Sequence, residues 1–451
     1  MTAPKGGIMK KLLSLLLVFT LCISLAACND GYQSQSHVYK KSLVSAAGEE
    51  HTVTYKDART DEYQAFLDKL DLFAAKLTKS VYASSDKGTN LAISPVSVYM
   101  ALALATECSN GDTRQEILDA VGVTYEEVSQ FTKYLYAFSN HEYTYESAWG
   151  KEKVSAFSEL ANSIWAHEGL PLNKQGLESL SNNYNCDSFS VDFTTNQAQK
   201  AINAYISDKT HGLIDGDIQF SPETIITLIN TFYLKEIWNV DGDELKFTDD
   251  KYDFINTDGS TTATKLLKGY YRNGQAFEGE NFTSFFTTTL HGYSIKFIVP
   301  NDGYSLESVF TAENIYAINN VSDYNYIDHE NKLLHNTRVF FPEYKADFDG
   351  NLMSVLKQNF GINKLFDFDG CDFSNITSEP AYCEAVIHKC SLNVNARGIE
   401  GAAITVMPMA GAAGPGEYVE VYHDYIVDRA FGYVITDSYG AVLFSGVINK
   451  I

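Results

Sequence analysis

This 451-residue sequence contains none of the common catalytic motifs. The nucleophile elbow GxSxG, the zinc-protease motif HExxH, the Walker loop and the dinucleotide motif GxGxxG are all missing. The ten histidines are scattered, and His335 and His388, beside strand-like runs, are interpreted as structural rather than as metal ligands. The acidic run 367–370 lacks the ligand spacing of a calcium loop. The sequence therefore predicts no enzyme, no cofactor and no metal site.

One stretch close to the C-terminus has an unusual composition. Residues 398–416 read GIEGAAITVMPMAGAAGPG and carry a single charge, at Glu400. Gly and Ala make such a segment flexible, whereas Ile399, Ile404 and Thr405 suit a strand. On composition alone, a linker is the simpler interpretation. The stretch can therefore be a loop or a strand, and its neighbours must decide between them.

The N-terminus predicts export. Lys10 and Lys11 precede the apolar run LLSLLLVFTLCISL, which is followed by Ala-Ala and Cys28. This order of charge, apolar run and small residues is that of a secretory signal, and the run is short for a membrane span. The sequence LAAC at 25–28 also resembles the bacterial lipobox, which implies lipidation of Cys28 and attachment to the cell surface. Residues 1–27 are interpreted as a lipoprotein signal peptide, with an ordinary secretory signal as the alternative.

Five cysteines remain after the predicted signal, because Cys22 leaves with it and Cys28 carries the lipid. They are Cys108, Cys186, Cys371, Cys383 and Cys390. An odd number without a CxxC pair is a poor disulfide framework and a poor zinc site. We expect buried free thiols.

Composition and charge limit the class of protein. With 45% hydrophobic residues, the chain can bury the core of one large domain or of two ordinary ones. The net charge of −23 argues against a nucleic-acid-binding surface, because such surfaces neutralise phosphates with Lys and Arg. The surplus of carboxylates is most simply a solvated surface.

The rest of the sequence predicts a tether followed by a folded body of helices and strands. The polar stretch 28–60 predicts a tether between the lipid and a folded body that starts near Asp61. Apolar spacing predicts an amphipathic helix over 63–77, and a second helical run, VSVYMALALATE, follows Ser94 and Pro95. Strand-like runs lie at 224–234, 292–300, 336–344, 385–394, 431–436 and 441–448. Helices early and strands late favour an α+β fold.

Six short stretches fall in the order and spacing typical of the serpin family, which the chain resembles from residue 61 to residue 451. They are Asn90–Ser97 (NLAISPVS), Asn230–Trp238 (NTFYLKEIW), Pro342, His388–Lys389, Gly398–Thr405 (GIEGAAIT) and Asp428–Phe431 (DRAF). The resemblance implies one domain over 61–451, with three β-sheets, about nine helices and an exposed reactive-centre loop at about 396–427.

The resemblance also implies a function. In this family a serine protease, or sometimes a cysteine protease, cleaves the loop as a substrate. The N-terminal part of the loop then inserts into the central sheet and carries the acyl-linked protease with it. We expect a monomeric, irreversible inhibitor that forms a covalent acyl complex with its target. The alternative is a noninhibitory serpin-fold binding lipoprotein, and a hydrolase is third because no nucleophile–base set is visible.

The hinge of the loop is predicted at Gly398–Thr405. As a strand it would place Ile399, Gly401, Ala403 and Thr405 on one face and Glu400, Ala402, Ile404 and Val406 on the other. The first set is uncharged and, after Ile399, small, which a packed sheet can admit. A large charged residue at Thr405 would be buried without a partner. The hinge departs from the family pattern at Ile399, Gly401 and the pair 396–397.

The reactive bond is predicted from the hinge. Counting along the family register from Ala396 places it at Ala412–Ala413, with Met409–Ala410 as the alternative. Bonds into proline are poor protease substrates, which disfavours those before residues 408 and 415. A small apolar residue before the cut suits an elastase-like or subtilisin-like protease, and no Arg or Lys lies between 398 and 428 for a trypsin-like one.

Other matched positions take family roles by resemblance. Ser94, Ser97, Asn230 and His388 would form a polar cluster beneath the opening sheet, and Trp238 would lie where insertion starts. The alternative is that these are ordinary structural polar contacts and a core aromatic.

Overall fold

The computed structural model describes residues 34–36, 38–39, 42–46, 56–146, 153–214, 218–238, 244–272, 276–320, 327–328, 330–399 and 419–451. Several predicted positions lie outside these ranges. They are Cys28 with the signal peptide 1–27, Glu400, Gly401, Ala402, Ala403, Ile404, Thr405, Met409, Ala410, Ala412 and Ala413.

Nine α-helices and two short 3-10 helices occur in the described ranges. The helices are α2 (Asp61–Ser84), α3 (Pro95–Cys108), α4 (Gly111–Val121), α5 (Tyr125–Phe138), α6 (Lys174–Tyr184), α7 (Asn196–Lys209), α8 (Leu306–Val309), α9 (Ala312–Asn319) and α10 (Met353–Phe360), with η1 (Asp57–Arg59) and η2 (Lys364–Phe366). No helix within these ranges is both long and apolar enough to cross a membrane.

The strands of the described residues form three sheets. The first half are β1 (Leu91–Ile93), β2 (His141–Glu146), β3 (Lys153–His167), β4 (Cys186–Val191), β5 (Ile226–Ile237), β6 (Tyr252–Ile255), β7 (Thr261–Thr264), β8 (Leu267–Arg272), β9 (Phe277–Glu278) and β10 (Phe282–Thr288). The others are β11 (Ser294–Pro300), β12 (Ile327–Asp328), β13 (Leu333–Phe341), β14 (Tyr344–Asn351), β15 (Ile387–Asn395), β16 (Gly398–Ile399), β17 (Val419–Ile426), β18 (Phe431–Thr436) and β19 (Val442–Ile448).

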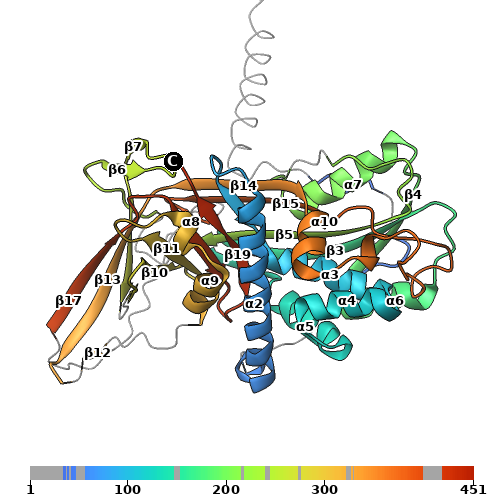
Figure 1. Cartoon of the computed structure of the whole chain (residues 1–451), viewed down its shortest axis with the longest axis horizontal. Helices are drawn as coiled ribbons and strands as arrows, with labels where there is room; N and C mark the ends of the chain where they lie inside the picture. Colours follow the sequence, from blue (N-terminus) through green and yellow to red (C-terminus); the bar gives the residue numbers. More distant parts are fainter. Residues whose placement is uncertain are drawn as a thin grey trace, which may run out of the picture.

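One large sheet dominates the molecule. Its order is β2-β3-β5-β16-β15-β14-β1-β19-β18-β11-β10-β9, with β4 paired to β3. A four-stranded sheet of β12, β13, β17 and β8 extends to the left in Figure 1, and β6 pairs with β7 in a hairpin. Within the described residues, the three sheets and nine helices confirm the expected α+β fold class.

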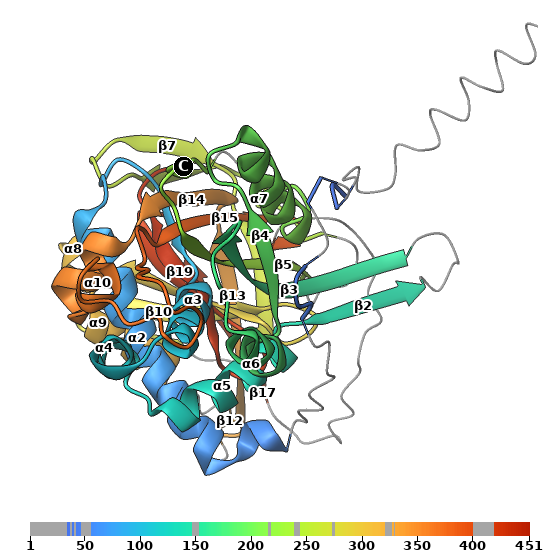
Figure 2. The same cartoon turned by 90° about the vertical axis from the view of Figure 1, so that its right-hand side faces the viewer.

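Helices cover both faces of β3 and β5, and strand alternation explains why. Trp165 and Ile229 pack in a small core with Ile202 of α7. Ile164 and Phe232 point the other way into the main core, to which α3 contributes. Because neighbouring residues of a strand face opposite sides, α3 and α7 lie on opposite faces of the sheet (Figures 1 and 2).

The position of α3 follows from its sequence. Ser94 accepts a hydrogen bond from the backbone N–H of Ser97 and so caps the helix, and Pro95 occupies the first turn, where no backbone donor is needed. Almost every later residue of α3 is buried, as its run of apolar residues requires. The helix is therefore fixed beneath the large sheet.

Part of the predicted tether contacts the folded body. Asp208 of α7 accepts hydrogen bonds from the Gln35 N–H at 2.6 Å and from the Tyr39 hydroxyl at 2.9 Å. Val44 forms an antiparallel bridge with Ser188 of β4. The segments 34–36, 38–39 and 42–46 therefore lie against α7 and against the edge strand β4.

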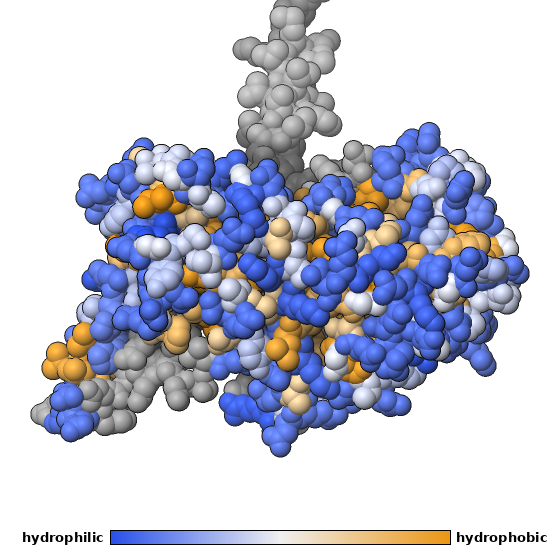
Figure 3. Space-filling model, in the orientation of Figure 1, coloured by the Kyte–Doolittle hydropathy of each residue, from blue (hydrophilic) through white to orange (hydrophobic). Residues whose placement is uncertain are grey.

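The surface agrees with the charge of the chain. Figure 3 shows that hydrophilic side chains cover most of the face seen in Figure 1, which is consistent with the net charge of −23. The five predicted thiols are free; Cys108, Cys186 and Cys390 are buried, whereas Cys371 and Cys383 are only partly buried. The expectation of buried thiols therefore fails for the last two.

Candidate functional site

The start of the predicted hinge lies inside the large sheet. Gly398 and Ile399 form β16, in which Gly398 lies opposite Ile237 of β5 on one side and Asn395 of β15 on the other. A Cβ atom on residue 398 would overlap the backbone carbonyl of Glu236, so this close approach requires glycine. Ile399 is completely buried. The described end of the hinge is thus already a strand, held between two others.

Beyond β16, the described residues place no strand between β5 and β15. Both β5 and β15 are described along their whole lengths, and no ladder joins one to the other. A narrow cavity separates their far ends and reaches down to α3. Its lining includes Ser97, Leu102, Asn230, Cys383, Ile387 and His388. The place that an additional strand would occupy is therefore bordered by β5, β15 and α3.

Three of the four predicted polar residues, Ser97, Asn230 and His388, line this cavity. The fourth, Ser94, contacts two of them. The backbone N–H of Ser94 donates to Nε2 of His388 at 3.2 Å, and Ser97 is joined to Ser94 through the helix cap. Asn230 lines the same cavity, but its amide donates to Oδ1 of Asn162 at 2.7 Å. The side-chain amide oxygen Oδ1 of Asn230 is buried without a hydrogen-bond partner. The structure therefore leaves this acceptor, on a residue that lines the cavity, unsatisfied.

His388 is held neutral in this cluster. Burial lowers its pKa to about 4, because a charged imidazole would lose its hydration. The neutral ring can accept the Ser94 N–H through Nε2, as the geometry requires. Near neutral pH the cluster carries no charge, and its contacts are hydrogen bonds between neutral groups.

Trp238 lies next to the described hinge. Its indole N–H donates to the carbonyl of Asn395 at 2.8 Å, and its ring packs edge-on against Phe341. The side chain is 2% exposed. Trp238 thus fastens the end of β5 to the turn that joins β15 to β16.

The other predicted histidine lies elsewhere. Nδ1 of His335 is 2.8 Å from Nε2 of His423, between the neighbouring strands β13 and β17. Among the described residues, no group of three or more His, Cys, Asp and Glu side chains is arranged to hold a metal ion.

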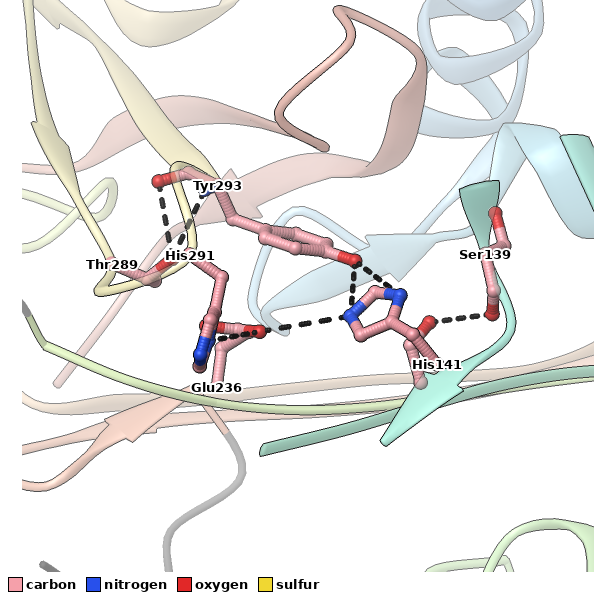
Figure 4. A network of polar contacts seen from close by, with 7 residues as sticks. Ser139, His141, Glu236, Thr289, His291 and Tyr293 are labelled. Carbon is pink, nitrogen blue, oxygen red and sulfur yellow. Dashed lines mark hydrogen bonds and ion pairs between the residues drawn. The ribbon is translucent and has the colours of Figure 1, made fainter. Parts of the chain in front are cut away.

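A charged cluster beside β16 was not predicted from the sequence (Figure 4). Both carboxylate oxygens of Glu236 lie 3.1 Å from Nδ1 of His291, and one lies 3.9 Å from Nε2 of His141. The Tyr293 hydroxyl is 2.9 Å from Nε2 of His141. The sequence contains one signal for this cluster, which is the glutamate inside the apolar strand sequence TFYLKEIW. A carboxylate buried in such a strand needs partners.

The partners keep Glu236 ionised. Burial alone would raise its pKa, but the hydrogen bonds and charges of His141 and His291 outweigh burial and hold the pKa below its ordinary value. The ionised carboxylate of Glu236 is therefore buried where β16 meets β5, because Glu236 pairs with Ile399.

Comparison with known proteins agrees with this architecture. A family model described as Serpin (serine protease inhibitor) matches residues 68–451. The chain is 27% identical to Iripin-1 of Ixodes ricinus over 375 residues, which cover 80% of this chain and 89% of that protein. It is 24% identical to Alpha-1-antiproteinase of Rattus norvegicus over 392 residues, covering 84% and 88%.

Solved structures show the same fold. The thermophilic serpin Tengpin in its native state superposes with a TM-score of 0.66 at 21% identity, covering 93% of this chain and all of Tengpin. Thyroxine-binding globulin in complex with thyroxine superposes with a TM-score of 0.67 at 20% identity, covering 86% and 99%. At these identities the likeness concerns the fold alone.

Proposed function

Because this chain belongs to the serpin family of serine protease inhibitors, we propose that it irreversibly inhibits a serine protease of the elastase-like or subtilisin-like type. Family membership supports a protease-inhibitor function in general. The observation that carries the finer proposal is β16, a strand that begins between β5 and β15, where the described part of the chain supplies no other strand.

The pairing of β16 sets the register for a longer inserted strand. Both of its ladders are antiparallel, so each residue added to β16 moves one residue back along β5 and one back along β15. Continued for six residues from Ile399, this register places Thr405 opposite Asn230 on one side and His388 on the other. The Thr405 hydroxyl could then donate to the unsatisfied oxygen of Asn230.

The same register assigns the faces of the strand. Ile399 points into the main core, so Gly401, Ala403 and Thr405 would follow it inward, toward α3. Glu400 would point to the opposite face. Small side chains on the inward face can enter between existing strands without overpacking.

The proposed reaction begins as ordinary proteolysis. The protease serine Oγ attacks the carbonyl carbon of Ala412, the bond to Ala413 breaks, and the new amine of Ala413 takes a proton. The acyl ester on Ala412 joins the two proteins. Insertion of the preceding residues would then move the protease before water hydrolyses the ester. Met409–Ala410 remains the alternative bond.

The N-terminal motif supports a location for this activity. Lipidation of Cys28 would hold the exported inhibitor at a bacterial surface, and an ordinary secretory signal would release it. We propose that the inhibitor acts as a monomer, with the target protease as its covalent partner and no nucleic-acid partner.

The test is to mix the protein from about residue 30 onward with neutrophil elastase, pancreatic elastase and subtilisin. The expected result is a band of summed mass that survives denaturing gels, with a released C-terminal peptide that starts at Ala413. Mass spectrometry of that peptide identifies the bond.

Two loop variants sharpen the test. Thr405→Arg would bury an unpaired charge opposite Asn230, so we expect cleavage at an unchanged rate with loss of the stable complex. The control, Glu400→Arg, places the same charge on the opposite face, and complex formation should persist. Cleavage of the unaltered protein without a complex, across a broad protease panel, would favour a noninhibitory binding lipoprotein instead.

A further inference from the structure

Glu236 is a completely buried carboxylate at the end of β5, and strand insertion by itself requires no charge at this position. Burying a carboxylate is costly unless an opposite charge accompanies it. His291 and His141, at 3.1 Å and 3.9 Å, can supply that charge when they are protonated. The carboxylate and its two imidazoles therefore form a unit whose strength depends on bound protons.

The two imidazoles come from different parts of the fold (Figure 4). His141 begins β2, which lies on the same side of the opening as β3 and β5. His291 lies in the turn between β10 and β11, and the strand order places this turn beyond β16 and β15. The contact of Glu236 with His291 therefore connects the two sides of the gap directly.

Backbone contacts cross the same junction, and they are few. The N–H of Leu290 donates to the carbonyl of Ile237 at 2.8 Å, and Trp238 forms an isolated bridge with Thr289. The turn is fixed to the rest of the sheet because β11 pairs along its length with β10 and β18. When β5 moves away from β15, it must therefore break its contacts with residues 289–291.

Other titratable groups face the cluster from the surrounding elements. The ring of Tyr143, on β2, stacks on His291 at 4.0 Å, and the hydroxyl of Tyr293, just before β11, contacts His141. Asp437, in the turn between β18 and β19, is 3% exposed and interacts electrostatically with His141. The cluster thus contains two carboxylates, two imidazoles and two phenols.

We propose that Glu236, His291 and His141 form a proton-dependent latch that holds β5 against the β10–β11 turn. The large sheet then opens more slowly at acidic pH than at alkaline pH. This inference rests on the strand insertion of the proposed function, because it concerns the step that makes room for the strand.

The direction follows from the charges. Histidine is the side chain that ordinarily changes charge between pH 5 and 8. A protonated imidazole compensates the charge of Glu236, and a neutral imidazole does not. Burial raises the pKa of Asp437 to about 6, so this carboxyl is neutral at more acidic pH and adds a second negative charge at alkaline pH. The stabilisation is therefore present at low pH and lost as the pH rises.

The test is hydrogen–deuterium exchange of the full chain between about pH 5.5 and 8.5, corrected for the intrinsic pH dependence of exchange. The informative peptides contain residues 235–238 and 289–293. Loss of a charged hydrogen bond predicts opening about tenfold faster at the alkaline end. Peptides from β18 and β19 report on the rest of the sheet and should show no such change.

Two variants separate the latch from simple packing. Glu236→Gln and His291→Gln each remove a charge and keep a side chain of similar size that can hydrogen-bond. We expect fast exchange of both peptides already at acidic pH and a flat pH profile. The matched control is His211→Gln, which removes a histidine 3.6 Å from Glu159 of β3, away from the junction. It should keep the original profile.

The outcomes separate the latch from the proposed function, because exchange is measured without a protease. A flat profile in the unaltered protein, or an unaltered profile in Glu236→Gln, would overturn the latch even if the protein trapped a protease. A pH-dependent opening that both variants abolish would support the latch even if no protease were trapped.

Discussion

The two ends of the gap between β5 and β15 are built from different chemistry. At the hinge end, which β16 closes, a buried Glu236 is balanced by imidazoles such as His291. At the far end, Ser97, Asn230 and a neutral His388 line a cavity above α3, and Ser94 donates its N–H to His388. One end is held by charge and the other by hydrogen bonds between uncharged groups.

Resistance to a new strand is concentrated at the hinge end. Separating a buried ion pair leaves an uncompensated charge, whereas neutral hydrogen bonds can be exchanged for new ones with an entering side chain. A strand that enters beside Glu236 would therefore meet its greatest resistance first. The far end would then accept the strand with little further loss.

We expect the largest effect from removing the carboxylate at the hinge end. Glu236→Ala removes the buried carboxylate and leaves the half-buried His141 and His291 without it, so we expect the free energy of unfolding to fall by about 3 kcal/mol near pH 6. Urea unfolding followed by tryptophan fluorescence measures this change. The control is Glu159→Ala, at a partly exposed carboxylate paired with Lys209, which should cost about 1 kcal/mol or less. Equal losses for the two variants would contradict the comparison.

The next effect concerns the neutral end. The pKa of His388 is lowered to about 4 in the folded protein. The unfolded chain therefore binds a proton at this histidine before the folded protein does, and stability is lost as the pH falls from the ordinary histidine pKa toward 4. We expect a loss of about 3 kcal/mol over that window, opposite in sign to the change at the hinge end.

Unfolding by urea between pH 7 and 4 measures this loss. His388→Gln keeps an acceptor for the Ser94 N–H and removes the titration, so its stability should fall less steeply with acid. His211→Gln serves as the control and should follow the unaltered protein. Parallel curves for all three proteins would show that His388 does not titrate differently on folding.

A smaller effect tests the seating of β16. Gly398→Ala places a Cβ against the carbonyl of Glu236, and we expect a loss of about 1–3 kcal/mol from the resulting backbone shift. Thermal unfolding and hydrogen exchange of residues 394–399 measure it. Gly88→Ala, in an open loop where a Cβ meets ordinary contacts, should change stability little. An unchanged exchange rate in Gly398→Ala would mean that β16 is not seated as described.

The smallest effect concerns a single hydrogen bond at the hinge end. Trp238→Phe removes the donation to the Asn395 carbonyl and keeps most of the ring packing, so we expect a loss of about 1 kcal/mol. Urea midpoints measure the loss. Tyr344→Phe removes a buried hydroxyl that has no hydrogen-bond partner, and it should be neutral or slightly stabilising. A larger loss at Tyr344 than at Trp238 would reverse the expected order.

Much of the fold could be predicted because its elements have local signals. The apolar run at 431–436 coincides with β18, and the run at 385–394 differs from β15 (Ile387–Asn395) by one or two residues at each end. The first helix extends beyond the predicted 63–77 because Thr60 caps it at Asp61. Its C-terminal part is buried too, although the prediction stopped at residue 77.

The site was only partly predictable, because some of its contacts depend on tertiary pairing. Ser94 and His388 were grouped by resemblance, and the structure joins them directly. The bond from Asn230 to Asn162 was not expected, since it depends on β3 lying in register beside β5. The partners of Glu236 come from positions 141 and 291, and no local pattern in the sequence connects them.

The contact of Val44 with Ser188 has a consequence for aggregation. β4 pairs with β3 on one side, and its other edge would present free backbone donors and acceptors to any passing strand. The Leu43 N–H donates to the Ser188 carbonyl, and the Ser188 N–H donates to the Val44 carbonyl, so the chain itself covers part of this edge. A shortened protein that begins at residue 56 would expose a template for intermolecular β-pairing, and its solubility would then depend on its surface charge alone.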